Sequence, residues 1–383
     1  MDPMIQVMFR RFLLFFIVVL ILPGCRARKP ELLVVSIEPA RVTLVAVGDI
    51  LMHQDVQKAA IQNGGFATLW AEVTPLFLSA DLVFGNLETP IAPIIGQPGE
   101  PYLFNAPAEL PEALKRSGFT ILSTANNHAY DQGTRGLLET QTRLEVAGLV
   151  SIGSGRDQRQ AMTPRILERN GIRIAFLAWT DLFNRHLNRE GQGPWVNGMD
   201  EELASEAVRA ARLQADAVVV SVHWGKEDRH APTLRQRAVA SRLFAAGADL
   251  ILGHHPHVLQ PFEVSELGGR HVAVAYSLGN FISNQDRLYD AEQMPLVQGD
   301  ERDGAAFTAT FIRMSPNRVV LEKIGYTPLW TENNWPEVSA GKTGQREIRV
   351  VRLDVPTRQT QPWSQRRERI REVIGRNFEN PSP

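Results

Sequence analysis

The chain has 383 residues, which is enough for one large domain or two small ones. Its 41 basic and 42 acidic residues give a formal net charge of -1, and 44% of its residues are hydrophobic, as in an ordinary globular protein. Because no long run of like charge precedes the C-terminal segment, the sequence gives no support to electrostatic binding of DNA or RNA, and we expect no nucleic-acid partner.

The N-terminal segment has the pattern of a signal peptide, which we assign to residues 1–25. Arg10 and Arg11 precede the apolar stretch FLLFFIVVLIL, whose 11 residues would form a helix of about 16 Å, short of a hydrocarbon core of about 30 Å. The sequence LPGC follows and resembles a bacterial lipobox, although Pro23 is unusual there. Cys25 is the only cysteine, so it cannot form a disulfide within the chain.

We therefore expect Cys25 to carry lipid, with residues 26–40 as a linker. The protein would then be an exported lipoprotein, bound to a membrane of a bacterial envelope on its periplasmic or extracellular face. A plain signal peptide or an uncleaved anchor with an incidental cysteine is the alternative.

Five apolar runs of the main segment, residues 41–356, end in polar residues. Each run has the length of a buried strand, and near-continuous apolar strands fit a sheet that is covered on both faces. In chain order the runs are RVTLVAVGDI ending near Asp49, SADLVFGNLE at Glu88, GFTILSTANNH at Asn127 and His128, ADAVVVSVHWG at His223, and GADLILGHHPH at His255 and His257.

Helical patterns separate these runs, at residues 107–118, 134–148, 199–214 and 233–247. Alternating strands and helices predict an α/β domain whose site lies at the carboxyl ends of the strands. Beyond His257, the segments 270–281, 304–314, 317–330 and 346–355 read as strands, which predict a second, more antiparallel sheet packed on the first. Residues 357–383 are expected to form a polar tail with a surface helix.

The residues at the strand ends suit metal binding, because the sheet would bring them to one edge. The set offers nitrogen and oxygen donors but no thiolate, which favours Zn, Mn or Fe. On an extended backbone His255 and His257 would point to one side and His254 to the other, so we expect His254 to lie away from the site.

The order of these motifs resembles that of the calcineurin-like metallophosphoesterases, and more closely that of the CapA family of poly-γ-glutamate capsule proteins. The resemblance covers roughly residues 42–282 and is carried by VAVGDILMH, DLVFGNLETPI, STANNHAYDQG, VSVHWGKE, GADLILGHHPHVLQPFE and AYSLGNFI. It implies an α/β sandwich in which helices flank two central mixed β-sheets.

Carried over position by position, the resemblance implies one or two divalent ions (Mn, Zn or Fe) held by Asp49, Glu88, Asn127, His223, His255 and His257. His128 would face the leaving group and act in catalysis, with Asp131 orienting it. Two positions depart from the superfamily pattern. Leu51 replaces a histidine ligand, which makes His53 a possible ligand, and Glu88 replaces an aspartate that bridges two metals.

The resemblance implies a metal-dependent hydrolase that cleaves a phosphoester or γ-glutamyl bond during the synthesis or handling of capsule polymer. Partners would be an anionic polymer or phosphoester substrate, the membrane, and membrane proteins of capsule synthesis. The alternative is a non-catalytic module that uses the metal to bind or tether an anionic surface polymer. Trp224, Glu227 and Asn280 lie near the strand ends and are candidates for substrate binding, although packing and turn roles would also explain them.

Overall fold

The computed structural model describes residues 39–97, 99, 101–189 and 193–381. Arg41–Pro383 forms one unit of the chain, which contains both large β-sheets and the helices that cover them. The predicted signal peptide and Cys25 lie outside the described residues. Among the described residues, no helix has both the length and the apolar composition needed to cross a membrane.

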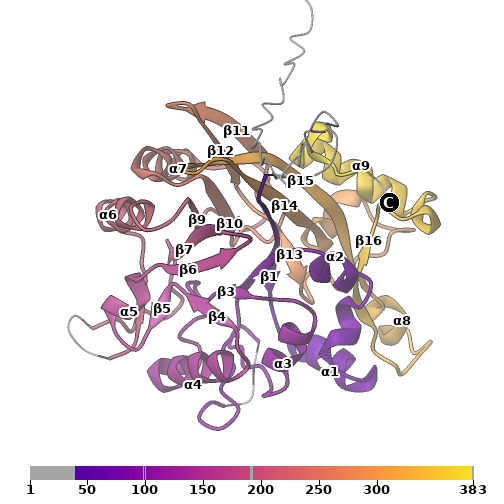
Figure 1. Ribbon diagram of the computed structural model, residues 1–383. Coiled ribbons are helices and arrows are strands. Elements are labelled where there is room, and N and C mark those ends of the chain that lie inside the picture. Colours follow the sequence, from indigo (N-terminus) through magenta and orange to yellow (C-terminus); the bar gives the residue numbers. More distant parts are fainter. Residues whose placement is uncertain (1–38, 98, 100, 190–192, 382–383) are drawn as a thin grey trace, which may run out of the picture. The chain divides into compact units, whose positions relative to one another are not determined.

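The first sheet has eight strands and combines parallel and antiparallel pairs (Figure 1). Four neighbouring strands run parallel, namely β1 (Arg41–Ile50), β2 (Leu82–Leu87), β3 (Ile121–Ser123) and β4 (Val150–Ile152). On the other side of β1 lie three antiparallel strands, β14 (Asp303–Ser315), β15 (Arg318–Asn333) and β16 (Ile348–Arg352). The short strand β13 (Asn280–Ile282) pairs in parallel with the end of β1.

The second sheet has six strands in the order β11-β12-β10-β9-β7-β6. Its inner strands are parallel and its two edge strands, β6 and β11, are antiparallel to their neighbours. Their bounds are β6 (Arg165–Arg169), β7 (Ile172–Thr180), β9 (Ala217–His223), β10 (Leu250–His254), β11 (Phe262–Leu267) and β12 (Arg270–Ala275). A separate pair joins β5 (Ser154–Gly155) and β8 (Trp195–Val196).

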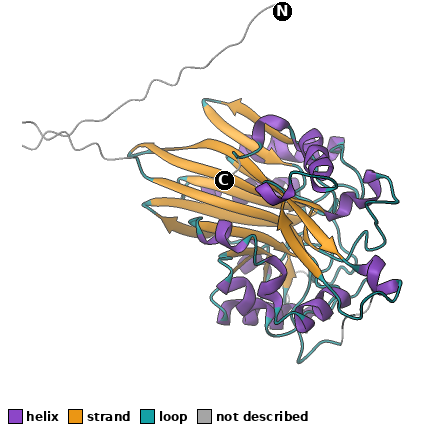
Figure 2. Ribbon diagram, turned by 90° about the vertical axis from the view of Figure 1, so that its right-hand side faces the viewer, coloured by secondary structure: helices purple, strands orange, loops and turns teal. Residues whose placement is uncertain are grey.

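Helices cover the outer sides of both sheets (Figure 2). One core lies between the first sheet and α1 (Gln54–Gln62), η1 (Phe66–Trp70), α2 (Thr74–Leu78), α3 (Leu110–Arg116) and α4 (Gly133–Val146). The second lies between the other sheet and α6 (Glu201–Arg212) and α7 (Leu234–Ala246). The remaining helices are α5 (Gln158–Met162), η2 (Leu296–Arg302), α8 (Trp335–Ser339), η3 (Pro356–Arg358), α9 (Trp363–Ile374) and η4 (Arg376–Phe378).

Local signals in the sequence explain where the two helices on the second sheet begin. The Asp200 carboxylate accepts hydrogen bonds from the first backbone N–H groups of α6. Thr233 and Gln236 form a capping box at the start of α7. Both arrangements satisfy donors that would otherwise lack partners, so these helices start where the sequence predicts.

The structure confirms an α/β fold with two mixed sheets flanked by helices, but it corrects the predicted membership of the sheets. The late strands β14, β15 and β16 do not form a second sheet, because β14 pairs with β1 from Arg41↔Ile312 to Ala46↔Phe307. The strands that end at His223 and His254 instead belong to the second sheet. Apolar patterning predicts that a strand is buried, whereas its hydrogen-bonding partner depends on the tertiary fold.

Candidate metal centre

The predicted ligands from both sheets converge on one buried place. Asp49 lies in β1 and Glu88 directly follows β2, while the second sheet contributes His223 at the end of β9 and the segment after β10. All of these side chains are buried. They form two groups, in each of which the ligand atoms lie within 4.8 Å of one another, and Glu88 belongs to both. The groups are Glu88, His255 and His257, and Asp49, Glu88 and His223.

Glu88 is the feature that most needs a cation. Its side chain is fully buried, and its Oε1 accepts no hydrogen bond from the described residues, with His223 Nε2 at 3.5 Å. Burial and the charge of Asp49 raise its pKa well above the usual range. Nδ1 of His255 is also buried without a hydrogen-bond partner among the described residues. Unpaired buried polar atoms are costly, so these oxygen and nitrogen atoms fit a divalent metal.

Asp49 is held in the ionised form. Its Oδ1 accepts a hydrogen bond from Asn86 at 2.8 Å, and its Oδ2 lies 3.2 Å from Nδ1 of His257. Burial would raise the pKa of Asp49, but hydrogen bonds and charge from His254 and His257 hold it well below its usual range. The two buried carboxylates therefore differ, because one is surrounded by donors and the other is not.

Asn86 is a central residue of the site that the sequence analysis left out of the ligand set. Its Nδ2 contacts three predicted ligands: Oδ1 of Asp49 at 2.8 Å, Nδ1 of His223 at 3.3 Å and Oε2 of Glu88 at 3.5 Å. Its position in the sequence could have revealed it: Asn86 lies two residues before Glu88, and residues two apart on a strand point to the same side. His223 also approaches Asn127, whose Oδ1 lies 2.9 Å from its Nε2.

The predicted catalytic histidine lies beside this centre and contacts its predicted partner. Nδ1 of His128 is 2.8 Å from Oδ2 of Asp131, which also accepts the backbone N–H of Phe104 at 2.7 Å. The His128 ring lies against Phe104, with centroids 4.5 Å apart. Asn184, which the sequence analysis did not single out, places its Nδ2 at 3.3 Å from Nε2 of His128. The ring is thus fixed at Nδ1, while Nε2 faces an exposed side chain.

The alternation expected for the three closely spaced histidines is wrong. Strand β10 ends at His254, and both His255 and His257 have positive φ angles, +96° and +58°. The backbone turns there, so the rule for extended strands does not apply. His254 is fully buried, and its Nδ1 lies 3.4 Å from Oδ1 of Asp49. It therefore approaches Asp49, although it belongs to neither of the two groups of ligand atoms.

Comparison with known proteins places the chain in a family. Residues 43–285 match the family model described as "Bacterial capsule synthesis protein PGA_cap". The chain belongs to the PGA_cap family. It is 36% identical over 242 residues to the PGA biosynthesis protein CapA of Bacillus subtilis (strain 168), covering 62% of this chain and 62% of that protein. Over 256 residues it is 34% identical to the capsule biosynthesis protein CapA of Bacillus anthracis, covering 65% and 61%.

The chain thus spans about three fifths of the length of these two CapA relatives. Two solved structures align more weakly. The NAD nucleotidase of Haemophilus influenzae has a TM-score of 0.44 and 14% identity, covering 77% of this chain and 53% of that one. The 5'-nucleotidase precursor of Thermus thermophilus has a TM-score of 0.44 and 14% identity, covering 73% and 54%.

A cavity of about 830 Å³ opens beside the candidate metal centre of this PGA_cap domain. His128 and His257 line it, and so does His53, the possible additional ligand. Burial and the charge of His257 lower the pKa of His53 to about 4. His53 belongs to neither of the two groups of ligand atoms, and its Nδ1 accepts the backbone N–H of Asn284 at 3.3 Å.

Of the three residues predicted to contact substrate, only Glu227 lines the cavity. Glu227 is exposed and lines the cavity, where a ligand can reach it. Trp224 does not: its side chain is fully buried in the core of the second sheet, and its indole N–H donates to the carbonyl of Tyr276 at 2.9 Å. Its large apolar ring is thus used for packing. Asn280 is buried behind His257 and does not line the cavity.

Proposed function

We propose that this protein is a metal-dependent hydrolase of the bacterial cell envelope that acts on a phosphoester or γ-glutamyl bond in the synthesis or handling of capsule polymer. The observation that carries the proposal is the pair of ligand groups that share Glu88, whose buried Oε1 has no hydrogen-bond partner among the described residues, beside an open cavity. The names of the CapA relatives, which concern PGA and capsule biosynthesis, support the choice of polymer.

Charge favours an anionic substrate. Asp49 and Glu88 together carry a charge of -2 when both are ionised, so two divalent cations would leave the centre positive and one would leave it near neutral. When bound, such ions supply Lewis-acid activation and lower the pKa of water to about 7. A phosphate ester and a carboxylate next to a γ-glutamyl bond both fit this charge, which is why the proposal keeps the two substrate classes.

The chain's own residues divide the remaining work. Asp131 contacts His128 at Nδ1, and His128 lines the cavity, so its Nε2 is the ring nitrogen that would pass a proton to the leaving oxygen or nitrogen. Glu227 lies at the cavity, where it can contact the substrate. His53 lines the same cavity together with His128 and His257, and its low pKa keeps it neutral at physiological pH.

The place of action belongs to the same proposal. Export through residues 1–25 and a lipid on Cys25 would hold the catalytic unit at a membrane, where polymer made by membrane proteins of capsule synthesis becomes accessible. A non-catalytic tether is the alternative, and it predicts polymer binding without turnover. Leu51, at the position of a superfamily ligand, lines the cavity and is the feature that favours this alternative.

Glu88→Gln separates the two functions, because it keeps the size of the side chain and removes its charge. For a two-metal hydrolase, the change should empty at least one metal site and abolish hydrolysis. For a tether, binding of poly-γ-glutamate should survive. The measurement is metal content per chain together with turnover of phosphodiester and γ-glutamyl substrates and polymer binding.

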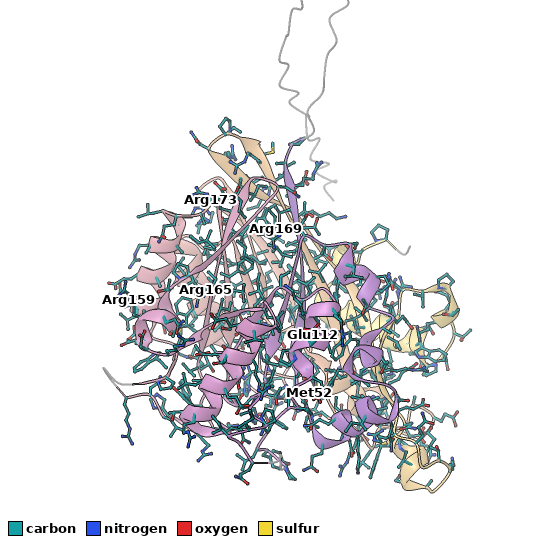
Figure 3. All side chains as sticks on the ribbon, turned by 60° about the horizontal axis from the view of Figure 1, so that its bottom comes forward. Met52, Glu112, Arg159, Arg165, Arg169 and Arg173 are labelled. Carbon is teal, nitrogen blue, oxygen red and sulfur yellow. The ribbon has the colours of Figure 1, made fainter. Side chains whose placement is uncertain are left out.

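The matched control is Glu112→Gln, which makes the same change at an exposed glutamate of α3 (Figure 3) and should leave all three readouts unchanged. A wild-type protein that binds one metal and turns over neither substrate class would contradict the hydrolase. Turnover that survives Glu88→Gln with both metals in place would show that another residue is shared between the metals.

A further inference from the structure

Asn280 is held rigidly next to the strand that carries Asp49. In the parallel pair of β1 and β13, Asn280 stands opposite Asp49, and the backbone N–H of Asp49 donates to the carbonyl of Gly279 at 3.0 Å. Gly279 has a φ of +64°, and a Cβ on Gly48 would lie only 1.8 Å from the Gly279 carbonyl oxygen. Only glycine permits this contact, so the position of Asn280 relative to Asp49 is set by the backbone.

The contacts of the Asn280 amide determine which way it points. Its nitrogen donates to the side-chain oxygen of Gln285 at 2.7 Å and to the backbone carbonyl of Glu301 at 2.9 Å. A backbone carbonyl can only accept, so Nδ2 must lie on that side. Oδ1 therefore faces His257, whose Nδ1 is 3.1 Å away.

The orientation of the Asn280 amide determines which nitrogen of the His257 ring carries the proton. An amide oxygen can only accept, so Nδ1 of His257 must carry the proton, and Nε2 is the nitrogen left for a metal. Nε2 lies 4.0 Å from the unpaired Oε1 of Glu88, inside one of the two ligand groups. Histidines that bind metals commonly donate their other ring N–H to such a partner, which fixes the ring orientation.

Asp49 competes with Asn280 for the same proton. Its Oδ2 lies 3.2 Å from Nδ1 of His257, almost as close as the Asn280 oxygen. If Asn280 were absent, the N–H would turn to Asp49 alone and occupy an oxygen that the metal centre needs. Asn280 gives the proton a neutral acceptor, so that Asp49 stays available.

We propose that Asn280 is a positioning residue of the metal centre, which orients His257 with Nε2 toward Glu88 and keeps Asp49 free for a metal. The inference rests on the proposed function, because it takes His257 and Asp49 as ligands. Because Gln285 and Glu301 line the cavity, Asn280 also connects the cavity wall to the centre.

The test compares Asn280→Leu and Asn280→Asp with wild type. Leucine removes the acceptor for His257 as well as both donated hydrogen bonds, and we expect affinity for Mn²⁺ or Zn²⁺ to fall by about 10–100-fold. Aspartate keeps an acceptor for His257, although it loses the donors and adds a negative charge beside Gln285 and Glu301, so affinity should fall by less than about tenfold. Competition with a chelator measures affinity, and chemical denaturation measures the stability that both variants lose.

Asn197→Leu is the matched control. Asn197 is buried like Asn280, and its Nδ2 also donates two hydrogen bonds, to the carbonyls of Ala161 at 2.7 Å and Ala178 at 3.1 Å. It contacts no predicted ligand, so Asn197→Leu should lower stability and leave metal affinity unchanged. Equal loss of metal in Asn197→Leu and Asn280→Leu, or wild-type affinity in Asn280→Leu, would overturn the inference, as would equal losses in the leucine and aspartate variants of Asn280.

A second readout separates this inference from the proposed function. In the metal-free protein, ¹⁵N NMR of the imidazole should show a hydrogen-bonded Nδ1 proton on His257 that changes in Asn280→Leu and not in Asn197→Leu. If the wild type takes up no metal, the proposed function fails, while this signal still decides whether Asn280 orients the ring. A signal that Asn280→Leu leaves unchanged would overturn the orienting role.

Discussion

At the scale of single residues, the centre keeps two carboxylates buried at the ends of neighbouring strands. Asp49 has donors around it and stays ionised, whereas burial and the charge of Asp49 raise the pKa of Glu88. Two like charges in a buried place disfavour each other, which is why the pKa of Glu88 is raised and why a bound cation would favour its ionised form. Uptake of metal should therefore release protons and weaken as the pH falls.

His128→Ala should lower turnover by about 10²–10⁴-fold, the usual contribution of a general acid, while metal content stays the same. The reason is its position: Nδ1 bonds to Asp131, and the ring belongs to neither ligand group. Steady-state rates and metal analysis on the same preparation check this. His271→Ala, at a half-buried histidine of β12, is the control and should change neither. Loss of metal along with rate would instead make His128 a ligand.

At the scale of elements, arginines of α9 contact η2, which forms part of the cavity wall. Arg366 of α9 is almost fully buried and contacts both Asp303, at 3.0 Å from its Nε, and Asp300, at 3.1 Å from its Nη2. Arg369 adds a second contact to Asp300 at 2.7 Å. The helix predicted in the polar tail thus buries charge against η2, whose Glu301 lines the cavity.

Arg366→Met should lower the free energy of unfolding by about 3–5 kcal/mol, because it leaves the buried Asp303 without the arginine that contacts it. Burial already raises the pKa of Asp303 to about 7 even with Arg366 beside it. Urea denaturation measures the change. The control is Arg376→Met, where the arginine side chain is 65% exposed and pairs with Glu368, and we expect about 1 kcal/mol or less. Equal costs for the two variants would show that the buried contacts do not stabilise the fold.

The contact of His230 with Asp300 of η2 depends on pH. Burial would lower its pKa, but hydrogen bonds to Asp300 and the carbonyl of Leu259 outweigh burial and the opposing charge of Arg369, so the pKa is raised. A raised pKa in the folded state stabilises the protein below the unfolded value of about 6.5, and this stability is lost as the pH rises through the folded pKa.

The stability advantage of the wild type over His230→Gln should therefore shrink as the pH rises from below about 6.5 to above the folded pKa. Denaturation of both proteins across this range measures it. An advantage that stays constant, or that grows with pH, would contradict the assignment of a proton-dependent contact between His230 and Asp300.

At the scale of the whole molecule, the centre exists only where the two sheets meet. The carboxylates come from the first sheet and the imidazoles from the second, so neither sheet alone contains a complete set. The predicted signal peptide and lipidated cysteine, which lie outside the described residues, would place the whole molecule at a membrane.

Cys25→Ser should move the protein from the membrane fraction to the soluble or unprocessed fraction, because a lipid on the only cysteine would be lost. Fractionation and the size of the processed chain check this, and radiolabelled fatty acid should enter the wild type alone. Ser36→Ala, in the predicted linker, serves as the control and should change nothing. Membrane association and processing that persist in Cys25→Ser would exclude the lipid anchor.

The sequence by itself determined the α/β class, the family and the carboxylates and histidines of the two groups of ligand atoms, but not the place of Asn86 and His254. Short-range features carry this information: apolar runs predict buried strands, and the polar residues at their ends remain at the ends however the sheets assemble. Capping residues such as Asp200 and Thr233 likewise act within one turn of helix, so the starts of α6 and α7 followed from the sequence.

Only the tertiary structure decided which strand lies beside which, and therefore which side chains meet. The pairing of β14 with β1, the approach of His254 at the end of β10 to Asp49 of β1, and the packing of Trp224 into the core all depend on segments far apart in the chain. Asn280 shows the same point. Its neighbours His257 and Glu301 lie far from it along the chain on either side, and backbone contacts between β13 and β1 place it, which no local pattern could predict.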